Sequence, residues 1–176
     1  VERLAQAFTL NEAVCVYGDF DMDGTPAVAL LVRGLKALGF QKISYLQADR
    51  HKDGYGFHAH LAQQKIGEEQ VRLFVTVDVG ITDVEAVKIL QNQGVDVIIT
   101  DHHQEKEELP PAFAVVNPNQ KKDTSRLNHL CGCGVAFYLM VALNRHFRDK
   151  KLIPQGIDIK VLLDCFAIAT IADLVP

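Results

Sequence analysis

The sequence lacks the features that mark several common classes of protein. Its four cysteines form no Cys-x-x-Cys pair, so we expect reduced thiols packed in the interior rather than a disulfide framework or a cysteine metal site. The sequence contains no signal peptide and no apolar run long enough to span a membrane. We therefore expect a cytoplasmic protein that makes no membrane contact.

The chain also lacks an excess of basic residues. Lysine and arginine number 18 against 22 aspartates and glutamates, which gives a net charge of −4 and a pI of about 6.0. Chains that bind nucleic acid strongly usually carry a basic footprint, so any such contact here would need a local basic groove. Internal repeats and low-complexity tracts are absent as well.

What the sequence does contain is enough apolar residues for one sizeable core. The 176 residues are 48% hydrophobic, a normal proportion for one globular domain. The chain begins at Val1 rather than at methionine, and it stops at Pro176 directly after an apolar stretch. We therefore expect residues 1–176 to be one domain of a longer protein.

Short apolar runs alternate with helical patterns along the chain. The runs are rich in valine and isoleucine and mostly lack polar alternation, as expected for strands buried on both faces. They lie at 13–17, 43–46, 73–77, 95–100 and 114–116. The helical patterns lie at 26–38, 58–65, 83–93, 135–147 and 159–171. This alternation predicts an α/β fold with a mostly parallel sheet flanked by helices on both faces.

Polar residues follow three of the predicted strands directly. Asp19 follows the first strand, Asp78 the third, and Asp101, His102 and His103 the fourth. Sites in open α/β sheets form beyond the carboxyl ends of the strands. We therefore expect these acids and imidazoles to converge on one edge of the sheet.

The stretch GDFDMDGT, residues 18–25, places three carboxylates within five residues, and their repulsion calls for a cation. One interpretation is a calcium loop of the EF-hand type. Its twelfth position should be a bidentate glutamate but is Leu30, its eighth is Pro26, and a strand rather than a helix precedes it. These departures argue against calcium.

A second interpretation is a phosphatase of the haloacid dehalogenase type. DMDGT resembles the nucleophile motif of that family, with Asp21 attacking phosphorus and Asp23 as its acid-base partner. That motif follows four apolar strand residues, whereas 17–20 here read YGDF. The interpretation also leaves residues 101–103 without a role. We keep it as the alternative.

A third interpretation is a two-metal phosphoesterase. Two divalent ions about 3.5–4 Å apart need a bridging carboxylate, further carboxylates and one or two imidazoles. Oxygen ligands with some nitrogen suit Mn²⁺ or Mg²⁺, and the histidines favour Mn²⁺. The candidate ligands are Asp19, Asp21, Asp23, Asp78, His102 and Asp173.

Several blocks of sequence resemble the DHH phosphoesterase superfamily. TDHH at 100–103 resembles its signature, and its other motifs resemble GDFDMDG at 18–24, VTVDVG at 75–80 and ATIADLVP at 169–176. Three more blocks, at 48–57, 114–120 and 130–140, resemble one branch, the bacterial RecJ-type single-strand-specific exonucleases. Tyr17 stands where the small-nucleotide branches usually carry histidine. Thr25, Pro26 and Val79 depart from the family pattern without touching the candidate ligands.

The resemblance implies a role for each candidate residue. Asp21, Asp23, Asp78, His102 and Asp173 would hold two ions, Mn²⁺ or Mg²⁺, with Asp78 bridging. Asp19 would be a further ligand or supporting acid, His103 would face the scissile phosphate, and Asp101 would orient an imidazole. The ordinary alternative for Asp78 is a helix N-cap.

Substrate contacts are expected from a loop and from one later asparagine. Arg50, Tyr55 and the turn of Gly54 and Gly56 would touch nucleic acid, with backbone N–H groups near phosphate and the tyrosine stacked on a base. Asn117 is a further candidate of the same kind. A loop with solvated charges is the alternative. We expect Gly132 and Gly134 to allow close approach of helix and sheet.

The resemblance implies metal-dependent, 5′ to 3′ hydrolysis of single-stranded DNA in repair and recombination. A helicase or a single-strand-binding protein would be candidate partners. The DHH-associated and oligonucleotide-binding domains of such proteins are not in residues 1–176, so this chain alone would be weakly active. The alternatives are a small-nucleotide or oligonucleotide phosphoesterase and a scaffold without catalysis, which usually loses its ligands.

Overall fold

The apolar runs form the strands of one parallel sheet. The computed structural model describes residues 1–175, and the strands are β1 (Val14–Gly18), β2 (Ile43–Gln47), β3 (Leu73–Val77), β4 (Asp96–Thr100) and β5 (Ala114–Val116). Their order is β2-β1-β3-β4-β5, and every neighbouring pair is parallel. The predicted α/β class and parallel sheet are confirmed.

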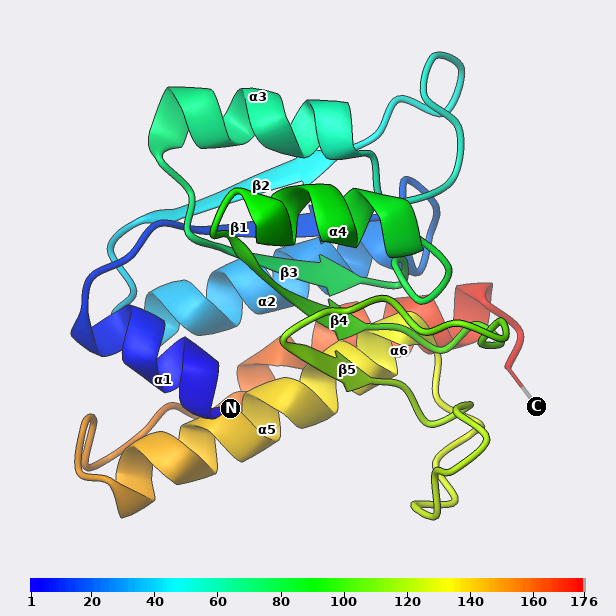
Figure 1. Ribbon diagram of the computed structural model, residues 1–176. Coiled ribbons are helices and arrows are strands. Elements are labelled where there is room, and N and C mark those ends of the chain that lie inside the picture. The colour runs from blue at the N-terminus through cyan, green and yellow to red at the C-terminus, as the bar shows by residue number, and fades with distance from the viewer. Residues whose placement is uncertain (176) are drawn as a thin grey trace.

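Helices cover both faces of this sheet (Figure 1). They are α1 (Glu2–Thr9), α2 (Gly24–Ala37), α3 (Ala59–Glu69), α4 (Val84–Asn92), α5 (Gly132–Asp149) and α6 (Leu163–Ala172), with a short 3₁₀ turn η1 (Ile159–Leu162) before the last. Helices α3 and α4 lie on one face, and α2, α5 and α6 pack together on the other. Helix α1 is not among the predicted helices, although its apolar residues join the core beside α5.

The burial of β1 explains why its sequence shows no alternation. Val14 and Val16 belong to the core under α2 and α5, whereas Cys15 and Tyr17 belong to the core under α3 and α4. A strand between two cores must be apolar on both faces, so it reads as a continuous hydrophobic run. Cys15, like the other three cysteines, is a buried free thiol, as predicted.

The strand register fixes the level at which the functional loops begin. Gly18 of β1 pairs with Val77 of β3, and Val77 pairs with Thr100 of β4. The next residues are therefore Asp19, Asp78 and Asp101, side by side at the carboxyl edge of the sheet. Helix α5 begins at this same edge and runs back along the sheet, and the C-terminal end of α6 lies there too (Figure 1).

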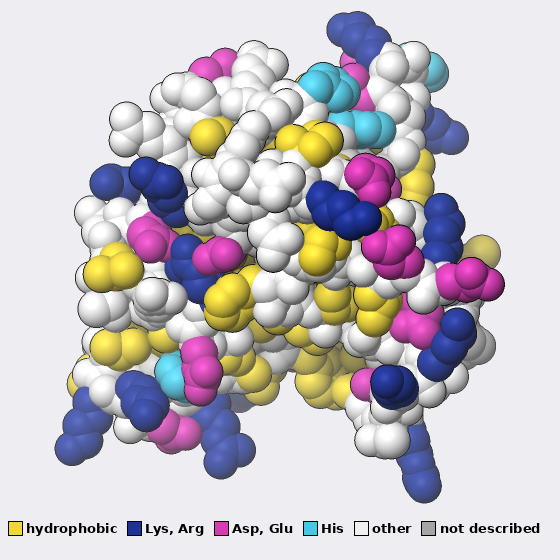
Figure 2. Space-filling view, in the orientation of Figure 1, with side chains coloured by type: hydrophobic (Ala, Val, Ile, Leu, Met, Phe, Trp, Pro, Cys, Tyr) yellow, Lys and Arg dark blue, Asp and Glu magenta, His cyan; other side chains and the backbone are white. Residues whose placement is uncertain are grey.

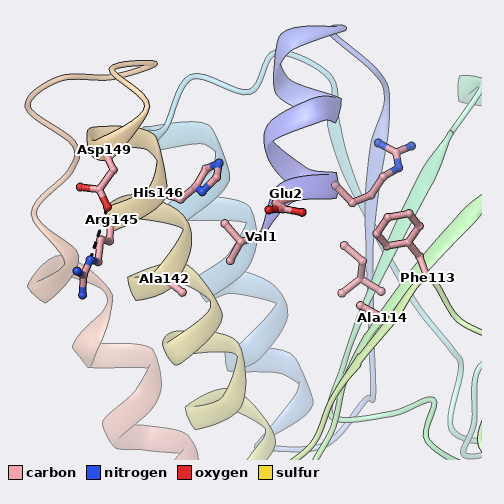
Figure 3. A pocket seen from close by; sticks show the side chains of 10 residues that line it. Val1, Glu2, Phe113, Ala114, Ala142, Arg145, His146 and Asp149 are labelled. Carbon is pink, nitrogen blue, oxygen red and sulfur yellow. Dashed lines mark ion pairs between the residues drawn. The ribbon is translucent and has the colours of Figure 1, made fainter.

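The opposite end of the molecule holds a separate cavity. It has a volume of about 550 Å³ and lies between the start of α1 and the second half of α5, with Phe113 and Ala114 on its other side (Figure 3). None of the candidate site residues lines it.

Charged side chains of both signs are mixed on the visible face of the molecule. In Figure 2, Lys and Arg side chains are scattered among Asp and Glu rather than gathered in one patch. Over residues 1–175, no helix combines the length and the apolar character needed to cross a bilayer.

Candidate metal centre

The loop after β1 folds back on itself before α2 begins. The carboxylate of Asp21 accepts hydrogen bonds from the backbone N–H groups of Asp23 (2.9 Å) and Gly24 (2.8 Å). This local turn is the reason three acids fit into so short a segment. Asp19 is 6% exposed, and its burial raises its pKa, with the charge of Asp21 adding to the shift.

Asp23 is hydrogen-bonded to the N-terminus of α5. Its two carboxylate oxygens accept hydrogen bonds from the N–H groups of Gly132 (2.5 Å) and Cys133 (2.8 Å). Free N–H groups and the positive end of the helix dipole both favour a carboxylate at this place. The contact joins residues more than one hundred positions apart, so no local sequence pattern predicts it.

Gly132 is the residue that lets the helix come this close. A Cβ atom on Gly132 would lie 2.5 Å from Oδ1 of Asp78 and 2.6 Å from its Cβ. Any larger residue would push α5 away from both Asp23 and Asp78. The predicted close approach of helix and sheet is therefore confirmed at Gly132.

Asp78 is a buried acid with an unsatisfied oxygen. It is 1% exposed, has a positive φ of 61°, and its Oδ1 has no hydrogen-bond partner among the described residues. Burial, reinforced by the charge of Asp23, raises its pKa to about 10. A buried carboxylate oxygen without a donor is costly unless a cation satisfies it.

Asp101 organises the histidine loop. One of its oxygens accepts hydrogen bonds from the N–H groups of His102 (2.7 Å) and His103 (3.1 Å), and the other accepts from Ile81 N–H (2.9 Å). The first oxygen also lies 2.7 Å from Nδ1 of His103. Although burial opposes it, this bond keeps the pKa of Asp101 below its usual value, and the same bond raises the pKa of His103.

His102 lies among three carboxylates. Its Nε2 is 3.2 Å from Oδ1 of Asp78 and 3.7 Å from Oδ2 of Asp23, while its Nδ1 is 3.8 Å from Oδ2 of Asp173. Asp173 follows directly after α6, and burial raises its pKa. The two histidines share Asp78 as a neighbour, since Nδ1 of His103 lies 3.9 Å from the same oxygen, but only His102 reaches Asp23 and Asp173.

The candidate ligands form three overlapping groups, within each of which one ligand atom per residue lies within 4.8 Å of the others. The groups are Asp19, Asp21 and Asp78; Asp78, His102 and His103; and Asp23, His102 and Asp173. Asp78 and His102 each belong to two groups. The structure thus brings together every residue proposed as a metal ligand, although metal binding by each stays a prediction. Carboxylates with imidazole are a suitable donor set for Mn²⁺.

The predicted substrate loop lies beside this cluster. The hydroxyl of Tyr55 is 3.1 Å from Nδ1 of His103, and the tyrosine is 48% exposed. Gly54 and Gly56 have positive φ angles of 74° and 128°, which a turn of this shape requires. The guanidinium of Arg50 lies over the ring of Phe20, 5.7 Å from its centre.

Tyr17 does not face the candidate ligands. It is fully buried, and its hydroxyl donates to the carbonyl of Gly56 (3.0 Å) and accepts from the N–H of His58 (3.3 Å). Tyr17, which stands where the small-nucleotide branches usually carry histidine, therefore holds the loop around Gly56 through these two hydrogen bonds. Burial raises its pKa, so its hydroxyl stays protonated.

Asn117, a candidate substrate contact, lies buried beneath the histidine loop. It is only 2% exposed, and its side-chain amide donates to the carbonyl of His103 (2.9 Å). Asn119 donates in the same way to the carbonyl of His102, a contact the sequence did not suggest. Sequence position could have predicted these contacts, because Asn117 and Asn119 follow β5 and β5 lies next to β4. Burial leaves Asn117 poorly placed to touch substrate.

Comparison with known proteins agrees with this geometry. The profile described as "DHH family, N-terminal domain" matches residues 13–170. The single-stranded-DNA-specific exonuclease RecJ of Haemophilus influenzae is 40% identical over 181 residues, which cover all of this chain and 31% of that protein. The chain thus spans about a third of the length of this curated relative.

Two solved structures share the fold and part of the sequence. The crystal structure of exonuclease RecJ bound to manganese matches with a TM-score of 0.84 and 35% identity, over 99% of this chain and 42% of that one. RecJ from Thermus thermophilus in complex with Mn²⁺ matches with a TM-score of 0.80 and 32% identity, over 99% and 24%.

These matches exclude the calcium-loop and haloacid-dehalogenase interpretations, because the profile covers residues 13–170 and the relative matches the whole chain rather than GDFDMDGT alone. The extent of the profile match and the likeness over the whole sequence lead to one conclusion: the chain belongs to the DHH family, with exonucleases named RecJ among its relatives.

Proposed function

We propose that this chain is the catalytic domain of a single-strand-specific DNA exonuclease that hydrolyses phosphodiester bonds with two divalent metal ions. The observation that carries the proposal is the buried carboxylate of Asp78, which belongs to two groups of candidate ligands. Its Oδ1 accepts no hydrogen bond in the described structure and lies 3.2 Å from Nε2 of His102. Relatives named as single-stranded-DNA-specific exonucleases support the substrate class.

The residues present fit two Mn²⁺ or Mg²⁺ ions. Asp78 would be shared, with Asp19 and Asp21 on one side of it and His102 on the other. Asp23 and Asp173 would complete the site around His102. When bound, the ions supply Lewis acidity toward the phosphoryl oxygens and lower the pKa of the attacking water.

His103 would act on the scissile phosphate. Its Nδ1 is held by Asp101 and faces the hydroxyl of Tyr55, so the ring is fixed and Nε2 is the nitrogen available to substrate. The bond to Asp101 raises the pKa of His103 in the metal-free chain, and the ring would stabilise negative charge that develops on the phosphoryl oxygens. Asp101 contributes by orienting this ring.

The loop of Tyr55 and Arg50 would hold the single strand. The exposed ring of Tyr55 can stack on a base, and Arg50 supplies a positive charge near the site. We propose 5′ to 3′ polarity, cytoplasmic location and a role in DNA repair and recombination, with a helicase or a single-strand-binding protein as partner. The DHH-associated and oligonucleotide-binding domains would lie outside residues 1–176.

A scaffold without catalysis is the less favoured alternative. Such a scaffold has no need of its ligands, yet every candidate ligand position here holds a competent residue, and the structure gathers them all. A small-nucleotide phosphoesterase is likewise disfavoured, because Tyr17 fills the histidine position and its hydroxyl is bonded to the carbonyl of Gly56.

The choice between single strands and small nucleotides can be tested directly. With Mn²⁺ present, we expect the chain to hydrolyse a single-stranded oligodeoxynucleotide faster than a dinucleotide and to leave duplex DNA intact. H103A should lower the rate by a factor of about 10²–10⁴, as for loss of an acid-base or charge-stabilising group. H146A, at the far end of α5, is the control. Preference for the dinucleotide would move the assignment to the small-nucleotide class.

Metal binding can be measured apart from activity. Calorimetric titration with Mn²⁺ should give two bound ions, or one tight and one weak. D78N should lose one ion or weaken both at least about a hundredfold, because it removes the shared charged ligand. D149N is the matched control, since this acid is exposed at the end of α5. Absence of binding by the unmodified chain would contradict an intact metal site.

The raised pKa of Asp78 predicts a pH dependence for the metal-free chain. Its folded pKa of about 10 lies above the ordinary 3.8, so at neutral pH unfolding releases a proton. The free energy of unfolding should therefore fall from pH 5 to pH 8, by on the order of 1 kcal/mol per pH unit. The raised pKa values of Asp19, Asp173 and His103 act in the same direction.

Urea unfolding at several pH values measures this effect. D78N should flatten the fall, because the amide does not titrate, and Mn²⁺ should reverse it by binding the ionised carboxylates. An equal slope in D78N would show that Asp78 is not the source.

The close approach at Gly132 predicts a strong effect of one methyl group. In G132A the new Cβ would meet Asp78, so α5 must withdraw from Asp23. We expect a loss of about 1–3 kcal/mol of stability together with weakened Mn²⁺ binding. Denaturant unfolding and calorimetry measure the two effects.

G67A is the matched control for this change. A Cβ at Gly67 meets nothing within 4 Å in α3, so this variant should be about 0.5–1 kcal/mol more stable. Unchanged Mn²⁺ affinity in G132A would mean that the helix N-terminus does not support the site.

A further inference from the structure

The histidine loop leaves the sheet immediately after β4. The last backbone bond between the two segments runs from the N–H of Asp101 to the carbonyl of Val116 (3.1 Å). Beyond this bond, two side chains instead of a neighbouring strand supply hydrogen bonds to the main chain. Asn117 donates to the carbonyl of His103 (2.9 Å) and Asn119 donates to the carbonyl of His102. We call these two residues and their two bonds the asparagine clamp.

The clamp completes the hydrogen bonding of the two histidine residues. Their N–H groups are both bonded to the carboxylate of Asp101, and their carbonyl groups are bonded to the two asparagines. Side chains thus supply the partners of all four backbone groups. The path of the main chain at His102 and His103 therefore depends on three side chains rather than on a strand ladder.

The clamp is itself held in place. The side-chain oxygen of Asn117 accepts the N–H of Asn119 (2.7 Å), and its carbonyl accepts from the side chain of Gln120 (3.0 Å). Pro118 between the two asparagines restricts the backbone further. With Asn117 only 2% exposed, its carboxamide has little freedom to turn.

The position of the imidazole rings depends on this arrangement. His102 can lie 3.2 Å from Asp78 and 3.7 Å from Asp23 only while its main chain stays where the clamp holds it. A displacement of about 1 Å is enough to spoil ligand or catalytic geometry.

We propose that Asn117 and Asn119 are positioning residues that hold the histidine loop in the geometry needed for metal binding and catalysis, an inference that rests on the proposed function. Asn117 thereby leaves the set of substrate contacts expected from the sequence. Its donor N–H₂ holds the loop, and its acceptor oxygen holds Asn119.

An aspartate substitution separates these two halves of the carboxamide. N117D keeps an acceptor for the N–H of Asn119 but loses the donor to the carbonyl of His103. N119D loses the donor to His102 and leaves the turn at Asn117 intact. Both variants add a negative charge behind the loop, which by itself would attract cations. The direct attraction of the added charge therefore acts against a loss of Mn²⁺ affinity.

Asn144 offers a matched control. It is 9% exposed and makes the same pair of bonds, donating to the carbonyl of Ile157 (3.0 Å) and accepting from its N–H (2.9 Å). These bonds tie the second half of α5 to the loop that follows. N144D thus loses an equivalent buried donor outside the histidine loop.

The experiment combines three measurements on the 176-residue chain and the three variants. Calorimetry gives the Mn²⁺ affinity, thermal unfolding gives the stability, and NMR hydrogen exchange without metal gives the protection of the His102 and His103 amides. We expect N117D and N119D to weaken Mn²⁺ binding about 10–100-fold, as when a supporting partner of a metal ligand is lost. Exchange of the two amides should accelerate, while N144D loses similar stability and changes neither readout.

Two results would overturn the proposal. One is unchanged Mn²⁺ affinity and unchanged amide exchange in N117D and N119D. The other is an equal loss in N144D, which would make the effect one of general stability. Where N117D does not fold, N119D decides, because it keeps the turn.

Failure of the proposed function gives a different pattern. The unmodified chain would then bind no Mn²⁺, and the amide exchange of the variants would decide the clamp alone. Faster exchange confined to the histidine loop would support it, and exchange equal to that of the unmodified chain would reject it.

Discussion

Repulsion among carboxylates at one edge of the sheet is the constraint on which the rest of this structure depends. The register of β1, β3 and β4 sets Asp19, Asp78 and Asp101 at one level, and Asp23 joins them from the next turn. Burial makes each ionised carboxylate costly, and the raised pKa of Asp78 expresses that cost. A site with so much like charge folds only if protons, donors or cations compensate it.

The carboxylates differ in the hydrogen-bond donors that face them, and this difference separates their roles. Asp101 receives three N–H groups and an imidazole, so it stays ionised and serves as a support. Asp23 accepts hydrogen bonds from two N–H groups at the N-terminus of α5. The Oδ1 of Asp78 accepts no hydrogen bond within the described residues, although Nε2 of His102 lies 3.2 Å from it. The fold has thus supplied donors to Asp101 and Asp23 but no hydrogen bond to Oδ1 of Asp78, the acid that the proposed ions would share.

Sequence reasoning recovered what is local and periodic. The strands, the parallel sheet and the gathering of Asp19, Asp78 and residues 101–103 follow from apolar runs and from the rule that sites form at strand ends. It missed α1 and the contacts that Asn117 and Asn119 make with the histidine loop. Those contacts join a side chain to a distant backbone carbonyl, which leaves no periodic trace. The burial that distinguishes Asn117 from a surface asparagine is a property of the assembled fold.

The hydrogen bonds between α5 and Asp23 bear on the order in which the protein folds. The two groups are separated by 109 positions in the chain, and Asp173 comes later still. Contacts of such long range close late, because the loop between them must first lose its conformational entropy. During synthesis the sheet can pair its first strands long before α5 and α6 emerge. We therefore expect the acidic edge to stay open to water early in folding, and the candidate ligands to come together only when the last helices dock.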